Sequence, residues 1–130
     1  MTEMDTAPSP AGELTMQTVA MPKDTNASGD IFGGWLVSQM DLAAMVAAQR
    51  VAKGRVATVA IDEMNFMVPV KVGAVVSCFA DISSVGRSSI HVQVEVWIAN
   101  QGSTELNKVT EGVFVFVAID DNGRTRAIAG

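Results

Sequence analysis

A long apolar segment at residues 33–53 constrains the fold of this chain more than any other feature. Its residues are good helix formers without proline, and only Ser38, Gln39 and Asp41 interrupt its apolar surface before the polar residues at its end. Gly54 follows directly and is expected to close the helix. Because a helix that is apolar on nearly every side is a buried one, the sequence predicts a single long central helix.

The rest of the chain is typical of strands joined by short turns. Residues 90–98 alternate strictly between apolar and other side chains, whereas residues 109–119 are apolar on both faces and are expected to be covered twice, once by a partner chain. Strands are predicted at residues 14–20, 56–61, 74–82, 90–98 and 109–119. Turn formers at residues 70–73, 84–87, 100–103 and 120–123 favour antiparallel pairing. This order predicts an α+β fold, a curved antiparallel sheet wrapped around one helix.

The charge balance excludes one class of partner. Nine lysines and arginines stand against 14 aspartates and glutamates, which gives a net charge of −5. A protein with this net negative charge does not attract the negatively charged phosphate backbone of a nucleic acid, so nucleic acid is not expected as a partner. The length of 130 residues suits one domain, which we place at residues 14–130, after a loose tail at residues 1–13.

Cysteine usage and the apolar runs bear on location. The single cysteine, Cys78, can form neither an internal disulfide nor a thiolate metal cluster, which fits a reducing cytoplasm. Residues 1–13 are acidic where a secretion signal needs a basic region, and they lack an apolar stretch. Asp41 interrupts the apolar run at residues 31–48, and a carboxylate in mid-span costs about 2.5 to 3.5 kcal/mol. We therefore expect a cytoplasmic protein without a membrane span.

Two features near the start of the helix are candidates for chemistry. Asp41 stands in apolar surroundings, where burying a carboxylate costs free energy unless it is paired or takes part in a reaction. Such surroundings also make a carboxylate a stronger base. Asn26, Gly33 and Gly34 precede or open the helix, where backbone N–H groups can hold an oxyanion. The structural alternatives are a solvated or hydrogen-bonded Asp41 and an ordinary turn and cap.

Residues 21–41, MPKDTNASGDIFGGWLVSQMD, closely resemble the hallmark segment of the YciA-like acyl-CoA thioesterases, which are hotdog-fold enzymes. The similarity extends over nearly the whole chain after the tail. It continues through residues 54–59, 64–66, 69–70, 72–73, 85–90, 94–97 and 116–118. The resemblance implies the fold expected above and a reaction, hydrolysis of an acyl-CoA thioester to free CoA and a carboxylic acid, with broad acyl specificity.

The resemblance also implies roles for the candidate residues. Asp41 maps onto the key catalytic carboxylate, acting as a general base or as a nucleophile. Asn26 maps onto the second catalytic position and would orient water or substrate from the neighbouring protomer. The N–H groups around Gly33 and Gly34 would stabilise the developing oxyanion.

Coenzyme A is implied as part of the substrate, with no separate cofactor and no metal. Thr58 and Val59 correspond to the strand that lines the pantetheine channel. Arg87, Ser88 and Ser89 match a family segment near the coenzyme and are candidates for phosphate or pantetheine contacts, although a polar hairpin is the alternative.

The chain departs from the family pattern at two neighbouring positions of the helix. Ala43 and Ala44 stand where the family often has glycines, so their methyl groups are expected to narrow the acyl tunnel. A hotdog dehydratase relies on a catalytic histidine, and the single histidine, His91, is badly placed on a strand. The other alternative is a noncatalytic acyl-CoA-binding or regulatory module.

The shared site implies a homodimer, and the family commonly assembles dimers into a hexamer, a trimer of dimers.

Overall fold

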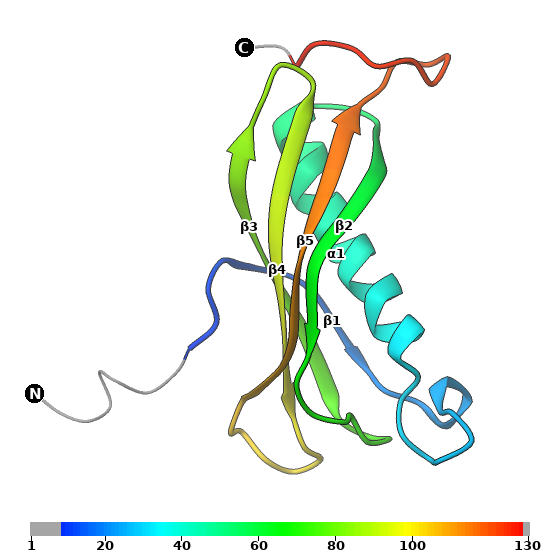
Figure 1. Cartoon of the computed structure of the whole chain (residues 1–130). Helices are drawn as coiled ribbons and strands as arrows, with labels where there is room; N and C mark the ends of the chain where they lie inside the picture. Colours follow the sequence, from blue (N-terminus) through cyan, green and yellow to red (C-terminus); the bar gives the residue numbers. More distant parts are fainter. Residues whose placement is uncertain (1–8, 129–130) are drawn as a thin grey trace, which may run out of the picture.

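The computed structural model describes residues 9–128, in which five strands surround one long helix (Figure 1). The elements follow the predicted order. They are β1 (Glu13–Val19), the short 3₁₀ helix η2 (Pro22–Asp24), α1 (Gly33–Ala52), β2 (Val56–Phe66), β3 (Val75–Val85), β4 (Ser89–Ala99) and β5 (Asn107–Ala118). This is the hotdog fold, as expected. No helix in the described part of the chain combines the length and hydropathy that a membrane crossing requires.

The boundary of the predicted tail differs slightly from the observed one. Residues 1–8 of that tail lie outside the described residues, as do residues 129–130. Glu13, which the sequence assigns to the tail, is the first residue of β1, and its carboxylate pairs with Arg50 of α1 at 2.9 Å. The backbone of Ala11 is also anchored, because its N–H donates to Glu95 Oε1 at 3.1 Å.

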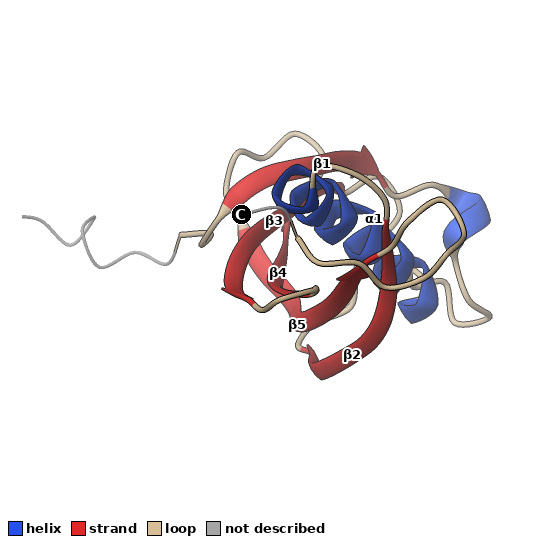
Figure 2. Cartoon of the chain, turned by 90° about the horizontal axis from the view of Figure 1, so that it is seen from above, coloured by secondary structure: helices blue, strands red, loops and turns tan. Residues whose placement is uncertain are grey.

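The five strands form one antiparallel sheet in the order β1-β3-β4-β5-β2, and the sheet curls around α1 (Figure 2). The turns at residues 84–87 and 100–103 join strands that pair, as predicted. The turn at residues 70–73 does not, because the chain crosses there from the β2 edge of the sheet to β3, beside β1. Across the turn at residues 120–123 the chain does pair antiparallel, through a bridge between Ile119 and Thr125 and a hydrogen bond from the Arg126 N–H to the Ala118 carbonyl at 2.9 Å. The expectation of pairing across a turn is therefore wrong only at residues 70–73.

The core lies between the concave face of the sheet and one side of α1. Alternate residues of β4 from Ile90 to Ile98 point inward, as predicted, and Phe114 and Phe116 of β5 face the same core. Val113, Val115 and Val117 on the opposite face of β5 are half-buried within the single chain. The helix is less enclosed than its composition indicates, because Leu42 on its far side is 43% exposed.

The helix ends through a different residue from the predicted one. Lys53, not Gly54, adopts the left-handed conformation (φ 54°), and its N–H donates to the carbonyl of Gln49 at 2.8 Å. Gly54 instead lets the Arg126 side chain approach the backbone closely, since a Cβ at Gly54 would lie 2.7 Å from Nη2 of Arg126. That nitrogen donates to the carbonyl of Ala52 at 3.0 Å and so satisfies one of the last carbonyls of the helix.

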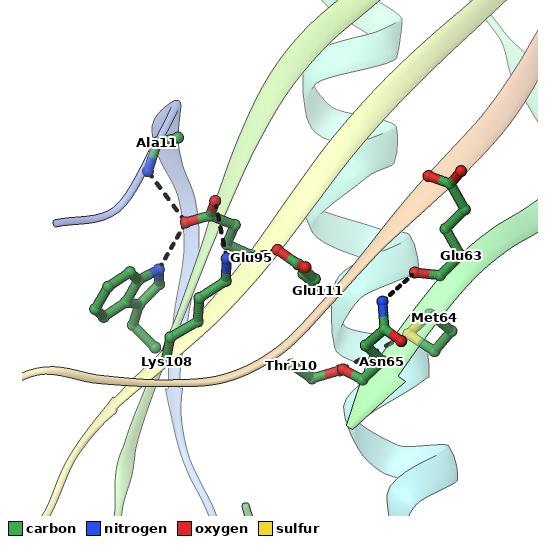
Figure 3. A network of polar contacts seen from close by, with 9 residues as sticks. Ala11, Glu63, Met64, Asn65, Glu95, Lys108, Thr110 and Glu111 are labelled. Atoms are coloured by element: carbon green, nitrogen blue, oxygen red, sulfur yellow. Dashed lines mark hydrogen bonds and ion pairs between the residues drawn. The ribbon is translucent and has the colours of Figure 1, made fainter. Parts of the chain in front are cut away.

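A polar cluster on the convex face of the sheet holds the segment before β1 (Figure 3). Glu95 accepts hydrogen bonds from the Ala11 N–H and from Nε1 of Trp97 at 2.8 Å, and it pairs with Lys108 at 3.4 Å. Lys108 also pairs with Glu111 at 2.5 Å, and this hydrogen bond is the main cause of a raised pKa of the Lys108 ammonium. The outward face of β4 is therefore also buried at Glu95 and Trp97, which its alternation does not predict.

Candidate active site

Asp41 lies about two turns into α1 and contacts the neighbouring strand β2. Thr58 Oγ1 donates a hydrogen bond to Asp41 Oδ1 at 2.7 Å. Thr58 faces the helix because it pairs with Phe116, whose side chain points into the core, and a bulge follows Thr58 in β2. Asp41 is half-buried, so its carboxylate is oriented by one hydroxyl and remains accessible to a substrate. We call Asp41 and Thr58 the carboxylate half-site.

The sequence reasoning missed this contact. It predicts that Thr58 and Val59 line a pantetheine channel, whereas the Thr58 hydroxyl is bonded to Asp41. Val59 occupies the bulge and is exposed. The spacing of 17 residues between Thr58 and Asp41 carries no local signal, because a strand and a helix meet here only through the tertiary fold.

Asn26 organises the loop before the helix. Its Oδ1 accepts hydrogen bonds from the N–H groups of Ser28 at 2.9 Å and Asp30 at 3.2 Å, and its own N–H donates to the Asp30 carbonyl at 2.7 Å. Within residues 9–128 the side-chain Nδ2 has no acceptor, and the residue is exposed. The side-chain oxygen of Asn26 therefore shapes the loop, and its NH₂ group is the part that can meet a ligand.

The loop is fastened to the chain on both sides. The Ile31 N–H donates to the Val70 carbonyl at 2.8 Å, and the Phe32 N–H donates to the Asp24 carbonyl at 2.7 Å. Lys71 forms an ion pair with Asp30. These contacts fix the position of Asn26 relative to the first turn of α1.

The first turn of α1 presents free backbone donors. Phe32 is the N-cap, without a side-chain cap, and its carbonyl accepts from the Trp35 N–H at 3.0 Å. The N–H groups of Gly33 and Gly34 have no acceptor among the described residues, as expected for the first positions of a helix. At Gly34 a Cβ would lie 2.8 Å from the Phe32 ring, so the glycine allows this ring to lie across the turn. We call Asn26, Gly33 and Gly34 the amide half-site.

The two half-sites of one chain are too far apart to act on one carbonyl group. Gly33 and Asp41 are eight residues apart on α1, which corresponds to about 12 Å along the helix axis. A reacting carbonyl lies about 3 to 3.5 Å from its base or nucleophile and about 3 Å from its oxyanion donors. Within one helix the Asp41 carboxylate and the Gly33 N–H therefore do not meet at one carbonyl group.

A cavity of about 340 Å³ opens beside the amide half-site. We call it the Gly33 cavity. Apart from Gly33 its lining residues all carry apolar side chains, and they are Leu36, Phe66, Met67, Val68, Pro69 and Val70.

A second, basic cavity lies at the β3–β4 hairpin. It has a volume of about 250 Å³ and contains two of the predicted coenzyme contacts, Arg87 and Ser88. Thr125, Arg126 and Ala127 complete its lining, whereas Ser89 opens β4 and is absent from it. The sequence reasoning missed Arg126, although the pair of basic residues at positions 124 and 126 was a visible signal.

Two other expectations are decided by burial. Ala43 and Ala44 are both 0% exposed in the core and line none of the described cavities, so the expected narrowing of an acyl tunnel by their methyl groups finds no support. His91 lies between the inward-facing Ile90 and Val92, so its ring is on the face of the sheet opposite to α1 and Asp41. Among residues 9–128 no group of three or more His, Cys, Asp or Glu side chains is placed to hold a metal ion.

Known proteins share this sequence and fold. The chain is 47% identical over 131 residues to the acyl-CoA thioester hydrolase YciA of Salmonella typhimurium, covering 98% of this chain and 97% of that protein. HI0827, a hexameric broad specificity acyl-coenzyme A thioesterase, matches with a TM-score of 0.90 and 49% identity, covering 96% of this chain and 86% of that chain. An acyl-CoA hydrolase from Staphylococcus aureus, solved with butyryl coenzyme A, matches with a TM-score of 0.81 and 30% identity, covering 88% and 70%.

Alanine mutants of two of these proteins have also been solved. In HI0827 the mutated residue is an aspartate. In the Staphylococcus aureus hydrolase the mutated residues are an asparagine and an aspartate, 15 positions apart. Residues 28–105 of the present chain match the profile of the thioesterase superfamily. Together with the identity over almost the full length, this match shows that the chain belongs to the thioesterase superfamily.

Proposed function

We propose that this protein hydrolyses acyl-CoA thioesters to free CoA and a carboxylic acid, with broad acyl specificity. The observation that carries the proposal is the accessible Asp41 carboxylate, oriented by the Thr58 hydroxyl. The chain also shares about half of its residues with named acyl-CoA thioester hydrolases. Asn26 and Asp41 are 15 positions apart, the spacing of the asparagine and aspartate that were mutated in the Staphylococcus aureus hydrolase.

The reacting groups come from two protomers in this proposal. The N–H groups of Gly33 and Gly34, with the NH₂ group of Asn26, hold the thioester oxygen and the attacking water or substrate on one protomer. Asp41 of the partner protomer acts on the carbonyl carbon from the other side. The distance of about 12 Å between the half-sites of one helix supports this division.

Two chemical routes satisfy the geometry. As a general base, Asp41 takes a proton from water, whose oxygen attacks the carbonyl carbon, and collapse of the tetrahedral intermediate breaks the C–S bond and releases CoA. As a nucleophile, the carboxylate attacks the carbonyl carbon itself and expels CoA, which leaves a mixed anhydride that water hydrolyses. In both routes the Thr58 hydroxyl keeps the carboxylate in one orientation.

The coenzyme is assigned to the β2 strand and the basic cavity. Thr58 and Val59 are proposed to border the pantetheine arm where β2 passes the carboxylate half-site. Arg87, Ser88 and Ser89 at the hairpin are proposed to contact phosphate or pantetheine groups, and Arg126 joins Arg87 in the same cavity. No further cofactor is required, because CoA enters as part of the substrate.

The proposed assembly is a homodimer that associates further into a hexamer, a trimer of dimers. β2 is an edge strand, and its exposed apolar side chains Val59 and Ile61 make it a suitable surface for a second copy. Hexameric relatives support the larger assembly. We place the protein in the cytoplasm, where a reduced Cys78 is expected.

The test is the release of CoA from acetyl-, butyryl- and octanoyl-CoA, measured with a thiol reagent. Cys78 does not interfere, because it is fully buried and burial raises the pKa of its thiol to about 12. The native protein is expected to release CoA steadily, whereas Asp41→Ala and Asn26→Ala lose about 100-fold or more of that rate. Asp121→Ala, at an exposed turn, is the matched control and retains the native rate.

Two outcomes separate this proposal from its rivals. Binding of acyl-CoA without release by the native protein identifies a noncatalytic binding module. Equal release by the native protein and Asp41→Ala contradicts the catalytic assignment of Asp41.

A further inference from the structure

The Gly33 cavity has the composition of a site for an alkyl chain. Its floor is formed by the buried side chains of Leu36 (4% exposed) and Val70 (1% exposed), and its wall by the exposed Phe66, Met67 and Val68. No charged or hydrogen-bonding side chain lines it. Its volume of about 340 Å³ falls in the range of small-molecule sites, and within the single chain it is a depression that is largely open to solvent.

The cavity is continuous with the amide half-site. Gly33 belongs to both, because it lines the cavity and carries one of the free N–H groups. The Phe66 ring lies 3.9 Å from the position that a Cβ of Gly33 would take, so this ring borders the cavity directly beside the amide half-site. A carbonyl group held by the Gly33 N–H thus has its α-carbon beside an apolar cavity.

The other cavities offer different chemistry. The cavity of about 450 Å³ near the end of α1 is bordered by the charged side chains of Glu13, Arg50 and Asp81. The basic cavity at the hairpin contains two arginines. Among the cavities described, only the Gly33 cavity joins the reacting groups to an apolar lining.

We propose that the Gly33 cavity receives the alkyl chain of the acyl group, and that Leu36 at its floor and Val68 at its wall set the preferred chain length. This inference rests on the proposed thioesterase function. It places the acyl chain and the oxyanion donors on one protomer, and the Asp41 that acts on that acyl group on the other. Each methylene buried in the cavity raises kcat/KM by about fourfold until the cavity is full.

The experiment compares kcat/KM for acetyl-, butyryl-, octanoyl- and lauroyl-CoA. Val68→Trp fills the cavity from its exposed wall and is expected to lower the ratio of octanoyl- to acetyl-CoA activity by about tenfold or more, because at least two methylenes lose their place. Val68→Ala enlarges the cavity and is expected to raise the ratio of octanoyl- to acetyl-CoA activity by a few-fold. Val72→Trp is the matched control, since Val72 is similarly exposed on the same connection but does not line the cavity. Leu36→Phe narrows the floor independently and is used if Val68→Trp does not fold.

The outcomes distinguish this inference from the proposed function. Loss of octanoyl- and lauroyl-CoA activity with retained acetyl-CoA activity supports it. Chain-length ratios that remain native in Val68→Trp and Leu36→Phe overturn it, while release of CoA by the native protein still supports the thioesterase. A change in oligomeric mass by light scattering with native ratios also overturns it and assigns the cavity to an interface between copies. No release of CoA from any substrate by the native protein overturns both.

Discussion

The division of the site between protomers leads to a quantitative mixing experiment. Asp41→Asn removes the carboxylate from every site, and Asn26→Ala removes the side-chain amide from every site, so each variant alone is expected to lose about 100-fold or more of the native rate. A mixed dimer of the two variants has one site with both native groups and one site with neither. The mixture therefore regains activity only if the two residues act across the dimer.

The fraction of the native rate that the mixture regains follows from how the two variants pair. Because Gly33 and Asp41 are about 12 Å apart along one helix, the proposed site takes its amide half-site and its Asp41 from different chains. When equal amounts of the variants pair at random in a two-fold symmetric dimer, half of the dimers are mixed and each has one native site. The expected rate is about a quarter of the native rate.

The assay uses coexpressed variants with different affinity tags, and CoA release from butyryl-CoA as the signal. A mixture of Asp41→Asn with Thr58→Ala is the matched control. Thr58 bonds to Asp41 within one chain, so each site of that mixed dimer lacks one member of the carboxylate half-site and no recovery is expected. A mixture of Asp41→Asn and Asn26→Ala that only sums the two parent rates refutes the division of the site.

Three other predictions test single contacts. Thr58→Val keeps the shape of the side chain but removes its hydrogen bond to Asp41, so kcat is expected to fall about tenfold while the melting temperature stays near the native value; an unchanged kcat contradicts the orienting role. Gly54→Ala places a Cβ 2.7 Å from the flexible end of Arg126 and is expected to cost about 1 kcal/mol or less of unfolding free energy, through loss of the Arg126 hydrogen bond to the Ala52 carbonyl, measured by denaturant titration. This cost should disappear in an Arg126→Ala background, and a cost that persists there rules out the clash. The raised pKa of Lys108 means that its ion pairs stabilise the fold below the unfolded value of about 10.4 and that this contribution is lost as pH rises through the higher native value. The unfolding free energy should therefore decline above about pH 10.4 by less than about 1 kcal/mol, since the cluster is partly exposed, and Lys108→Gln should remove that part of the decline.

Local pattern was enough to predict the order of the helix and strands, although β2 and β3 continue to Phe66 and Val85, beyond their predicted ends at residues 61 and 82. Residue composition predicts the start of α1 at Gly33, and the alternation in residues 90–98 predicts the inward face of β4, because both signals arise from neighbours in the chain. The catalytic candidates Asp41 and Asn26 were also visible in the sequence, the first as a carboxylate on an apolar helix and both through a long continuous family motif. What the sequence determined is therefore the elements and their order, and it also supplied the candidates for the reacting groups.

Only the tertiary structure decided how these parts meet. Three features bring together residues that are distant in the sequence. They are the position of β2 at the sheet edge beside β5, the hydrogen bond from Thr58 to Asp41 and the contact of Arg126 with Ala52. Their geometry depends on the curvature of the sheet around α1, which no local pattern encodes. The rigid rise of the helix then separates Asp41 from Gly33, which is the physical reason for proposing that the two half-sites of one active site come from different chains.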